Sequence, residues 1–232
     1  MTQLNVSRSN LSFQTEESIK MLRTSIQFSR VDVNSITITS CRPNEGKSFI
    51  AMELAKAFAD LGKKTLLVDC DIRNSVVARK LGVSDRTPGL SNFLVGDAAL
   101  KDILCSTRIP NLSIILSGSY APNPAELLSS ARFGNLCDAL NEKLDFVIYD
   151  TPPLTAVTDA VVVAQNTDGA VMVVSEGETD RRELVQCASV MENANVHIIG
   201  TVLNKAGSHG SKYGGYGKYG KYGYGYGYGK RD

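Results

Sequence analysis

The chain has 232 residues, of which 43% are hydrophobic and 21% are charged, and its net charge is +1. This length suffices for one α/β domain with a full core plus appendages, and it excludes two large domains. The near-neutral charge gives no indication of a nucleic-acid-binding or membrane-surface protein. Five cysteines without a CxxC pair and only two histidines argue against a disulfide framework or a zinc site, and they favour a reducing cytoplasm.

The predicted elements alternate between helix and strand along the chain. An amphipathic helix over residues 15–29 comes first, and the N-terminus shows no apolar run long enough for a signal peptide or membrane span. We then expect strands at 35–40, 65–69, 112–116, 146–150, 170–175 and 196–203, and helices at 46–61, 76–81, 100–104, 123–141 and 180–193. This alternation predicts a mostly parallel sheet with helices on both faces, which binds ligands at the carboxyl ends of its strands.

The last residues have a different composition. Residues 207–232 are nearly all glycine, tyrosine and lysine, so we predict a disordered tail. Five basic residues against one aspartate give this tail a net charge of +4, which leaves −3 for the rest of the chain. The predicted organisation is an N-terminal segment with a helix (1–34), an α/β domain (35–206) and the tail (207–232).

The first predicted strand leads into a loop with the pattern of a phosphate-binding loop. Residues 40–48 read S-C-R-P-N-E-G-K-S, which matches that pattern except that Ser40 replaces the usual first glycine. Phosphate binding needs backbone N–H groups at a helix N-terminus, a lysine on the β and γ oxygens and a hydroxyl on Mg²⁺. Gly46, Lys47 and Ser48 supply them. The triplet alone also occurs at ordinary helix starts, but the flanking strand and helix favour a nucleotide site.

Two further predicted strands end in acidic residues. Asp69 and Asp71 follow the strand at 65–69, and Asp150 ends the strand at 146–150. At the ligand edge of a parallel sheet, such carboxylates can hold Mg²⁺ directly or through water. Each aspartate alone is equally well explained as a helix cap or turn residue. The three signals in this order indicate a magnesium–nucleotide site.

At these residues the sequence resembles the bacterial tyrosine kinases of capsule and exopolysaccharide synthesis, in the form of the separate cytoplasmic subunits of Gram-positive bacteria. The resemblance covers the whole chain. The loop at 40–48 resembles the Walker A motif of this family, LLVDCDIR at 66–73 its "A-prime" motif, and FVIYDTPP at 146–153 its Walker B motif. The resemblance implies a P-loop kinase that uses ATP and Mg²⁺.

The implied reaction is in-line attack of a tyrosine oxygen on the γ-phosphate of ATP. Because a phenol has a pKa of about 10, a nearby carboxylate is useful as proton acceptor, and the resemblance implies Asp69 for this role. The candidate catalytic residues are Lys47, Asp69, Asp71 and Asp150, and the candidate metal ligands are Ser48, Asp71 and Asp150. The candidate nucleotide-binding residues are Pro43, Asn44, Glu45, Gly46, Lys47, Ser48, Phe49 and Asn204.

Asn204 is included because VLNK at 202–205 resembles the family segment whose asparagine faces the adenine. Its alternative interpretation is an ordinary turn residue at the end of a strand.

The tail carries the expected substrates, seven tyrosines two or three residues apart: Tyr213, Tyr216, Tyr219, Tyr222, Tyr224, Tyr226 and Tyr228. Intervening glycines leave each hydroxyl accessible. The tail spans roughly 25–30 Å, which suffices to reach the active site of a neighbouring subunit or its own. Full phosphorylation would change its charge from +4 to roughly −6 to −10 and favour its release. The alternative is a low-complexity tail that binds a partner by aromatic stacking.

The predicted N-terminal helix contains Glu17-x-x-Lys20-x-x-Arg23, which resembles the E-x-x-R-x-x-R motif for assembly of this family, with lysine at the middle arginine. By spacing alone these residues form the solvated face of an amphipathic helix. The resemblance implies a homo-oligomeric ring at the membrane through a separate transmembrane activator. Further implied partners are a phosphotyrosine phosphatase and polysaccharide-pathway enzymes, without nucleic acid.

Two other functions are compatible with parts of the sequence. A positioning ATPase of the partitioning type shares the sheet and Walker B motif, but its signature lysine is replaced here by Arg42 followed by Pro43. A nucleotide-dependent scaffold whose tail recruits partners is the second alternative.

Overall fold

The computed structural model describes residues 2–29, 33–84 and 87–207, so all seven tail tyrosines lie outside the described residues. The strands are β1 (Gln3–Leu4), β2 (Ser35–Ser40), β3 (Thr65–Asp69), β4 (Leu104–Thr107), β5 (Leu112–Ile115), β6 (Phe146–Asp150), β7 (Gly169–Ser175) and β8 (Ile198–Asn204). The helices are α1 (Phe13–Gln27), α2 (Lys47–Asp60), α3 (Val76–Lys80), α4 (Leu90–Val95), α5 (Leu100–Ile103), α6 (Pro124–Leu128), α7 (Ala131–Lys143), α8 (Asp159–Ala164) and α9 (Arg181–Asn193).

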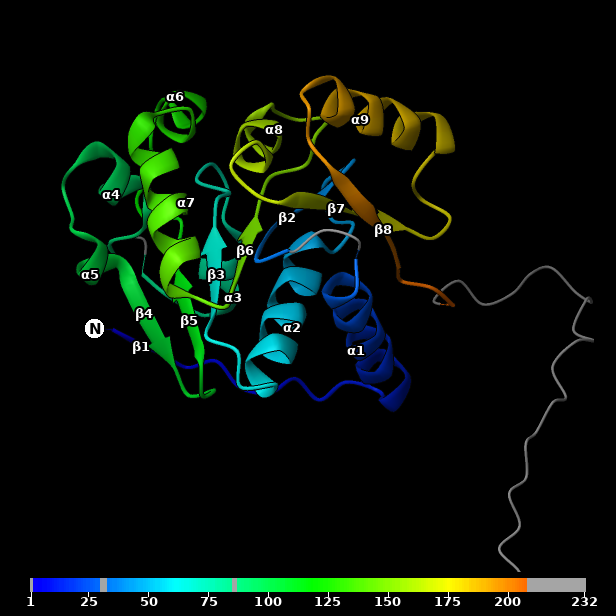
Figure 1. Cartoon of the computed structure of the whole chain (residues 1–232), viewed down its shortest axis with the longest axis horizontal. Coiled ribbons are helices and arrows are strands. Elements are labelled where there is room, and N and C mark those ends of the chain that lie inside the picture. The colour runs from blue at the N-terminus through cyan, green and yellow to red at the C-terminus, as the bar shows by residue number, and fades with distance from the viewer. Residues whose placement is uncertain (1, 30–32, 85–86, 208–232) are drawn as a thin grey trace, which may run out of the picture.

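All eight strands form one sheet in the order β1-β4-β5-β3-β6-β2-β7-β8 (Figure 1). The strands β5, β3, β6, β2, β7 and β8 are parallel, while β4 runs antiparallel to β5 and β1 pairs parallel with β4. The predicted mostly parallel sheet is therefore confirmed. The ends of β2, β3 and β6 converge at one edge, which positions the candidate site.

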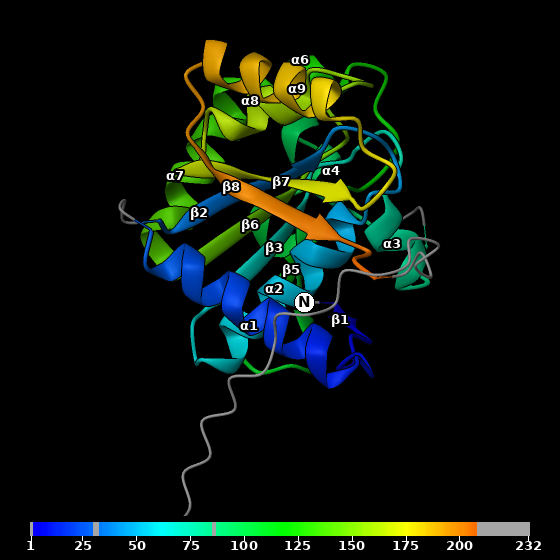
Figure 2. The ribbon, with the colours of Figure 1, turned by 90° about the vertical axis from the view of Figure 1, so that its right-hand side faces the viewer.

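The helices cover both faces of this sheet, with α1 and α2 on one side and α6, α7, α8 and α9 on the other (Figure 2). The alternation of strand side chains explains the two layers, because successive residues point to opposite faces. Leu67 and Ile148 join the core cluster under α1 and α2, whereas Leu66 and Val147 join the cluster under α4 and α7.

Several predicted bounds differ from the structure. The single helix expected at 123–141 is divided into α6 and α7, because Ser130 begins a new helix and its hydroxyl accepts a hydrogen bond from the N–H of Phe133. The expected helix at 15–29 begins earlier, after the N-cap Ser12. Four elements, β1, β4, α4 and α8, were not predicted.

The N-terminal residues pack onto the same sheet as the rest of the chain. Leu4 and Val6, together with Ile19 and Ile26 of α1, are buried in the core cluster that contains the first face of the sheet. Within the described ranges, no helix is long and apolar enough to cross a membrane.

Candidate active site

The loop between β2 and α2 adopts a conformation that few residues allow. Asn44 has a φ of 65° and Gly46 a φ of 95°, both in the left-handed region. A Cβ at Gly46 would lie 2.0 Å from the side-chain nitrogen Nδ2 of Asn204. Glycine is therefore required at position 46 by both its backbone and its neighbour.

Contacts from distant segments hold this loop. The buried carboxylate of Glu45 accepts a 2.8 Å hydrogen bond from the N–H of Arg42 and another from the hydroxyl of Thr179. The Nδ2 of Asn204 donates to the carbonyl of Glu45 at 2.9 Å, and the hydroxyl of Thr155 donates to the carbonyl of Cys41 at 2.6 Å. The loop is thus preorganised by residues from the ends of β6, β7 and β8.

Arg42 anchors the loop to α9. Its Nε lies 2.6 Å from Oε2 of Glu183, and its Nη1 donates to the carbonyl of Glu178 at 3.2 Å. The Glu183 carboxylate raises the pKa of Arg42. Pro43 and Asn44 of the same loop are exposed, whereas Lys47 and Ser48 at the start of α2 are buried.

The three predicted aspartates meet at the carboxyl edge of the sheet. Asp69 and Asp150 are register partners at the ends of β3 and β6. Asp71 follows β3, and its Oδ2 lies 3.8 Å from the Nζ of Lys47. All of these side chains are buried. The structure therefore brings the lysine of the loop and the carboxylates of two other segments into one cluster.

Burial determines the protonation of the two strand-end carboxylates. Burial, and to a smaller extent the neighbouring Asp150 charge, raise the pKa of Asp69 to about 8. Burial also raises the pKa of Asp150 to about 6, while the Lys47 ammonium and the Ser48 hydroxyl act in the opposite direction. Buried carboxylates that lie close together repel one another, which favours uptake of a proton or binding of a cation.

The oxygens of Asp150 fit a bound Mg²⁺. Both Oδ atoms are buried and have no hydrogen-bond partner among the described residues. No group of three His, Cys, Asp or Glu side chains in the described ranges could hold a metal ion. Mg²⁺ sites of ATP-using enzymes need only one or two carboxylates, which act together with substrate phosphates and water.

Asp69 and Asp71 differ in accessibility. Asp69 is fully buried and accepts hydrogen bonds from the N–H of Asp71, at 3.2 Å, and from the hydroxyl of Ser75. Asp71 lines a cavity of about 270 Å³ that also contains Arg73 and Tyr120. A substrate at this edge of the sheet would therefore meet Asp71 before Asp69.

The sequence analysis did not identify several residues that shape this site. Arg73 binds Asp159 of α8 in a bidentate manner, with Nε–Oδ2 and Nη2–Oδ1 distances of 2.7 and 3.1 Å. Asp159 is completely buried, and it lies where no element was expected. Ser75, Thr155 and Thr179 were also missed. Only Arg73 had a local signal, as the last residue of LLVDCDIR.

The remaining predicted residues lie on α1 and α2. Lys20 and Glu17 form a 2.6 Å ion pair on the exposed side of α1, and Glu17 raises the pKa of Lys20. The Nη1 of Arg23 donates to the carbonyl of Ala57 in α2 at 3.1 Å. Phe49 of α2 packs against the core cluster that lies under these two helices.

Comparisons with known proteins agree with this geometry. The family model described as "AAA domain" matches residues 33–180. The chain is 40% identical to tyrosine-protein kinase CpsD of Streptococcus agalactiae, over 100% of this chain and 98% of that protein.

Two solved structures are also similar. The chimerical protein CapA2B2 has a TM-score of 0.78 and 34% identity, covering 87% of this chain and 92% of the other. The septum site-determining protein MinD of Pyrococcus horikoshii OT3, complexed with Mg-ADP, has a TM-score of 0.65 and 25% identity, covering 75% and 71%.

Proposed function

The chain belongs to the bacterial tyrosine-protein kinase family within the AAA domain proteins, and on this premise we propose that it phosphorylates tyrosines of its own C-terminal tail. It is a protein-tyrosine kinase with a P-loop fold. The phosphoryl donor is ATP and the metal is Mg²⁺. The observation that carries this assignment is the pair of buried, unpartnered oxygens of Asp150 beside Lys47 and Ser48.

The residues of the cluster have separate roles in this proposal. The backbone of the loop from Pro43 to Gly46 receives the phosphates, and Lys47 orients the β and γ oxygens and balances their charge. Ser48, Asp71 and Asp150 would hold Mg²⁺, which supplies neutralisation of the charge that develops during transfer. Asn204 holds the carbonyl of Glu45 and borders the nucleotide site.

Asp69 is the proposed proton acceptor for the tyrosine hydroxyl. Only the ionised carboxylate can accept the proton, and the raised pKa of about 8 makes that ionised form a stronger base than an ordinary aspartate. The side chain is buried under Ser75, so access for the tyrosine requires the loop after β3 to open.

The expected acceptors are the seven tail tyrosines. The length of the tail supports transfer between subunits of a ring. Glu17, Lys20 and Arg23 are the proposed assembly residues. Because Arg23 already contacts α2, its side chain also fixes α1 within one subunit.

The biological setting belongs to the same proposal. A separate transmembrane activator would bring the kinase to the membrane from the cytoplasm, and a phosphotyrosine phosphatase would reverse the modification. Capsular or exopolysaccharide synthesis and export is the process regulated, with pathway enzymes as further substrates. The names of the relatives as tyrosine-protein kinases support the activity that underlies this setting.

Incubation of the full chain with ATP and Mg²⁺, followed by mass spectrometry of the tail, tests the proposal. We expect phosphotyrosine at residues 213–228, and none in Lys47→Met. A parallel reaction contains, in addition, the cytoplasmic segment of the activator. ATP turnover without phosphotyrosine in both reactions would contradict the kinase assignment and favour the positioning ATPase, whose fold MinD represents.

A further inference from the structure

The strand β8 is an uncovered edge of the sheet. It is the last strand in the sheet order, and in the described part of the chain it pairs only with β7. None of its seven residues is buried, whereas all seven residues of β7 are. Its sequence, I-I-G-T-V-L-N, is nevertheless apolar. A long apolar edge strand is a pairing site for another extended segment.

The backbone of β8 offers free hydrogen-bonding groups along this edge. The carbonyl of Asn204 accepts from the N–H of Glu176, on the β7 side. Because successive residues of a strand direct their backbone groups to opposite sides, those of Leu203 and Thr201 point outward. These outward N–H and C=O groups are the ones that an added strand would pair with.

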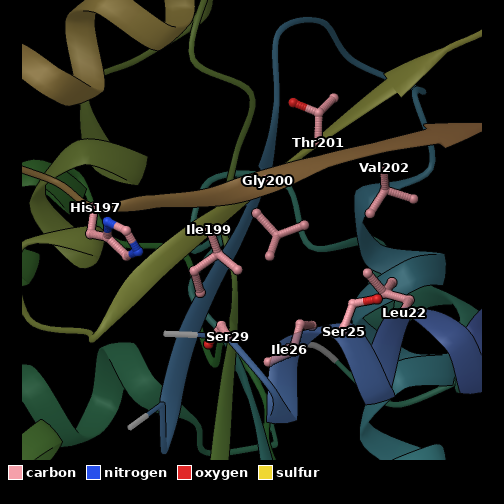
Figure 3. Close-up of a pocket in the computed structure, with 10 residues that line it drawn as sticks. Leu22, Ser25, Ile26, Ser29, His197, Ile199, Gly200, Thr201 and Val202 are labelled. Atoms are coloured by element: carbon pink, nitrogen blue, oxygen red, sulfur yellow. The ribbon is translucent and has the colours of Figure 1, made fainter. Parts of the chain in front are cut away.

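An apolar groove accompanies the edge on one side. Leu22 and Ile26 of α1 face Ile199 and Val202 of β8 across a groove of about 460 Å³, while Thr201 points to the opposite side (Figure 3). A Cβ at Gly200 would meet no atom within 4 Å, so the floor of the groove has spare room there.

This groove continues toward the end of the strand. A second groove, of about 480 Å³, lies between α1 and the last residues of β8, and it shares Leu22 and Val202 with the first. Together they follow β8 from His197 to Lys205. In Figure 2 the strand lies at the edge of the sheet between α1 and α9.

The tail contains a segment whose pattern matches this surface. Residues 222–228 read Y-G-Y-G-Y-G-Y, the same number of residues as β8. In an extended segment, this alternation puts four tyrosines on one face and three glycines on the other. The three upstream tyrosines are spaced three residues apart and lack this property.

The connection between the two segments permits their pairing. The chain leaves β8 at its carboxyl end, the described residues end three positions later at Gly207, and residues 208–221 link this point to the repeat over 14 residues. This link can extend at most about 50 Å, whereas the strand is about 23 Å long. For the repeat to run back antiparallel to β8, the link needs only to form a turn. Tethering also gives the repeat an effective concentration of order mM.

We propose that residues 222–228 dock onto the free edge of β8 as an additional antiparallel strand, with the four tyrosines against the groove between α1 and β8. Backbone pairing gives the binding energy, and apolar contacts of the rings give the register. Phosphorylation releases the repeat, because a doubly charged phosphate cannot be buried against Leu22, Ile199 and Val202. Only this release step rests on the proposed kinase function.

Amide hydrogen exchange of the full chain, treated with a phosphotyrosine phosphatase and free of nucleotide, tests the docking. We expect the N–H groups of Thr201 and Leu203 to exchange about ten-fold faster after Tyr222, Tyr224, Tyr226 and Tyr228 are all changed to serine. The matched control changes Tyr213, Tyr216 and Tyr219 to serine and keeps the slow exchange of the unchanged chain.

Any other pattern of exchange contradicts the proposed docking of residues 222–228 on β8. Equally fast exchange in all three proteins means that the edge is open. Equal protection that rises with protein concentration assigns the edge to a second copy of the chain, and equal protection at every concentration assigns it to another part of the same chain. Because no ATP is present, this result is independent of kinase activity, which the Lys47→Met comparison measures separately.

Discussion

The side-chain amide of Asn204 donates a 2.9 Å hydrogen bond to the backbone carbonyl of Glu45, and thereby joins the last strand of the sheet to the phosphate loop. The same nitrogen occupies the space that a Cβ at Gly46 would need. Loop conformation and the end of β8 are therefore coupled, although 159 residues separate Asn204 from Glu45.

Replacement of Gly46 by alanine should disrupt the nucleotide site. The new methyl group displaces Asn204 and the left-handed backbone is strained by about 1–2 kcal/mol, so we expect ATP affinity to fall at least about ten-fold. Gly200→Ala is the control, because its Cβ meets no neighbour. Isothermal titration of ATP–Mg²⁺ measures both. Unchanged affinity in Gly46→Ala would show that the loop tolerates the displacement.

Asp150→Asn should separate stability from metal binding. It removes a buried carboxylate without hydrogen-bond partners, which we expect to stabilise the nucleotide-free protein by about 1–3 kcal/mol. The melting temperature then rises by roughly 2–6 °C. In the unchanged protein, Mg²⁺ with nucleotide should raise the melting temperature further. Asp150→Asn should lose this increase. Differential scanning calorimetry measures these melting temperatures. The control is Asp138→Asn, because Asp138 is exposed. A lower melting temperature of nucleotide-free Asp150→Asn contradicts the argument.

The ion pair between Arg73 and Asp159 should contribute to stability through the burial of Asp159. Arg73→Ala leaves this completely buried carboxylate without its guanidinium, and we expect a loss of about 2–4 kcal/mol. The double variant Arg73→Ala/Asp159→Ala should recover part of this loss. Urea unfolding of the four proteins in a double-mutant cycle gives the coupling energy. A coupling energy near zero would show that the ion pair between Arg73 and Asp159 does not contribute to stability.

The stability of the nucleotide-free protein in a metal chelator should fall as pH rises from about 4 to 8. The pKa of Asp69 is raised in the folded state to about 8, so the folded protein binds more protons than the unfolded chain over this window. The contribution of Asp69 protonation to stability is complete below the ordinary aspartate pKa, and it is lost above the pKa of Asp69 in the folded protein. In thermal unfolding, Asp69→Asn should remove the fall above about pH 6, whereas Asp150, whose pKa is raised to about 6, still contributes below it. The same slope in both proteins would assign the effect to other groups.

Tail charge should control assembly if electrostatic repulsion drives release. Changing all seven tail tyrosines to glutamate moves the tail from +4 to −3, and we expect weaker self-association at low salt. Phenylalanine at the same positions is the control that keeps the charge. Analytical ultracentrifugation at low and high salt compares them. Equal association of the glutamate variant and the unchanged chain would exclude the charge mechanism.

Local sequence was sufficient for six of the eight strands, β2, β3, β5, β6, β7 and β8, and for the order of the nucleotide motifs. The strand at Thr65–Asp69 and the strand at Phe146–Asp150 were predicted with their observed bounds, because short apolar runs ending in acidic residues carry a local signal. Position at a strand end then determines the edge of the sheet on which Asp69, Asp71 and Asp150 lie. Sequence alone also identified Lys47 and Ser48 at the start of a helix.

The tertiary structure decided which distant residues complete the site and which surface is left open. Arg73 meets Asp159 across 86 residues and Asn204 meets Glu45 across 159 residues, and no local periodicity encodes such pairs. The open edge of β8 is likewise a property of the sheet order, because an apolar strand looks the same in sequence whether one or two neighbours cover it. Local patterns specify elements, whereas contacts and exposure depend on how those elements pack.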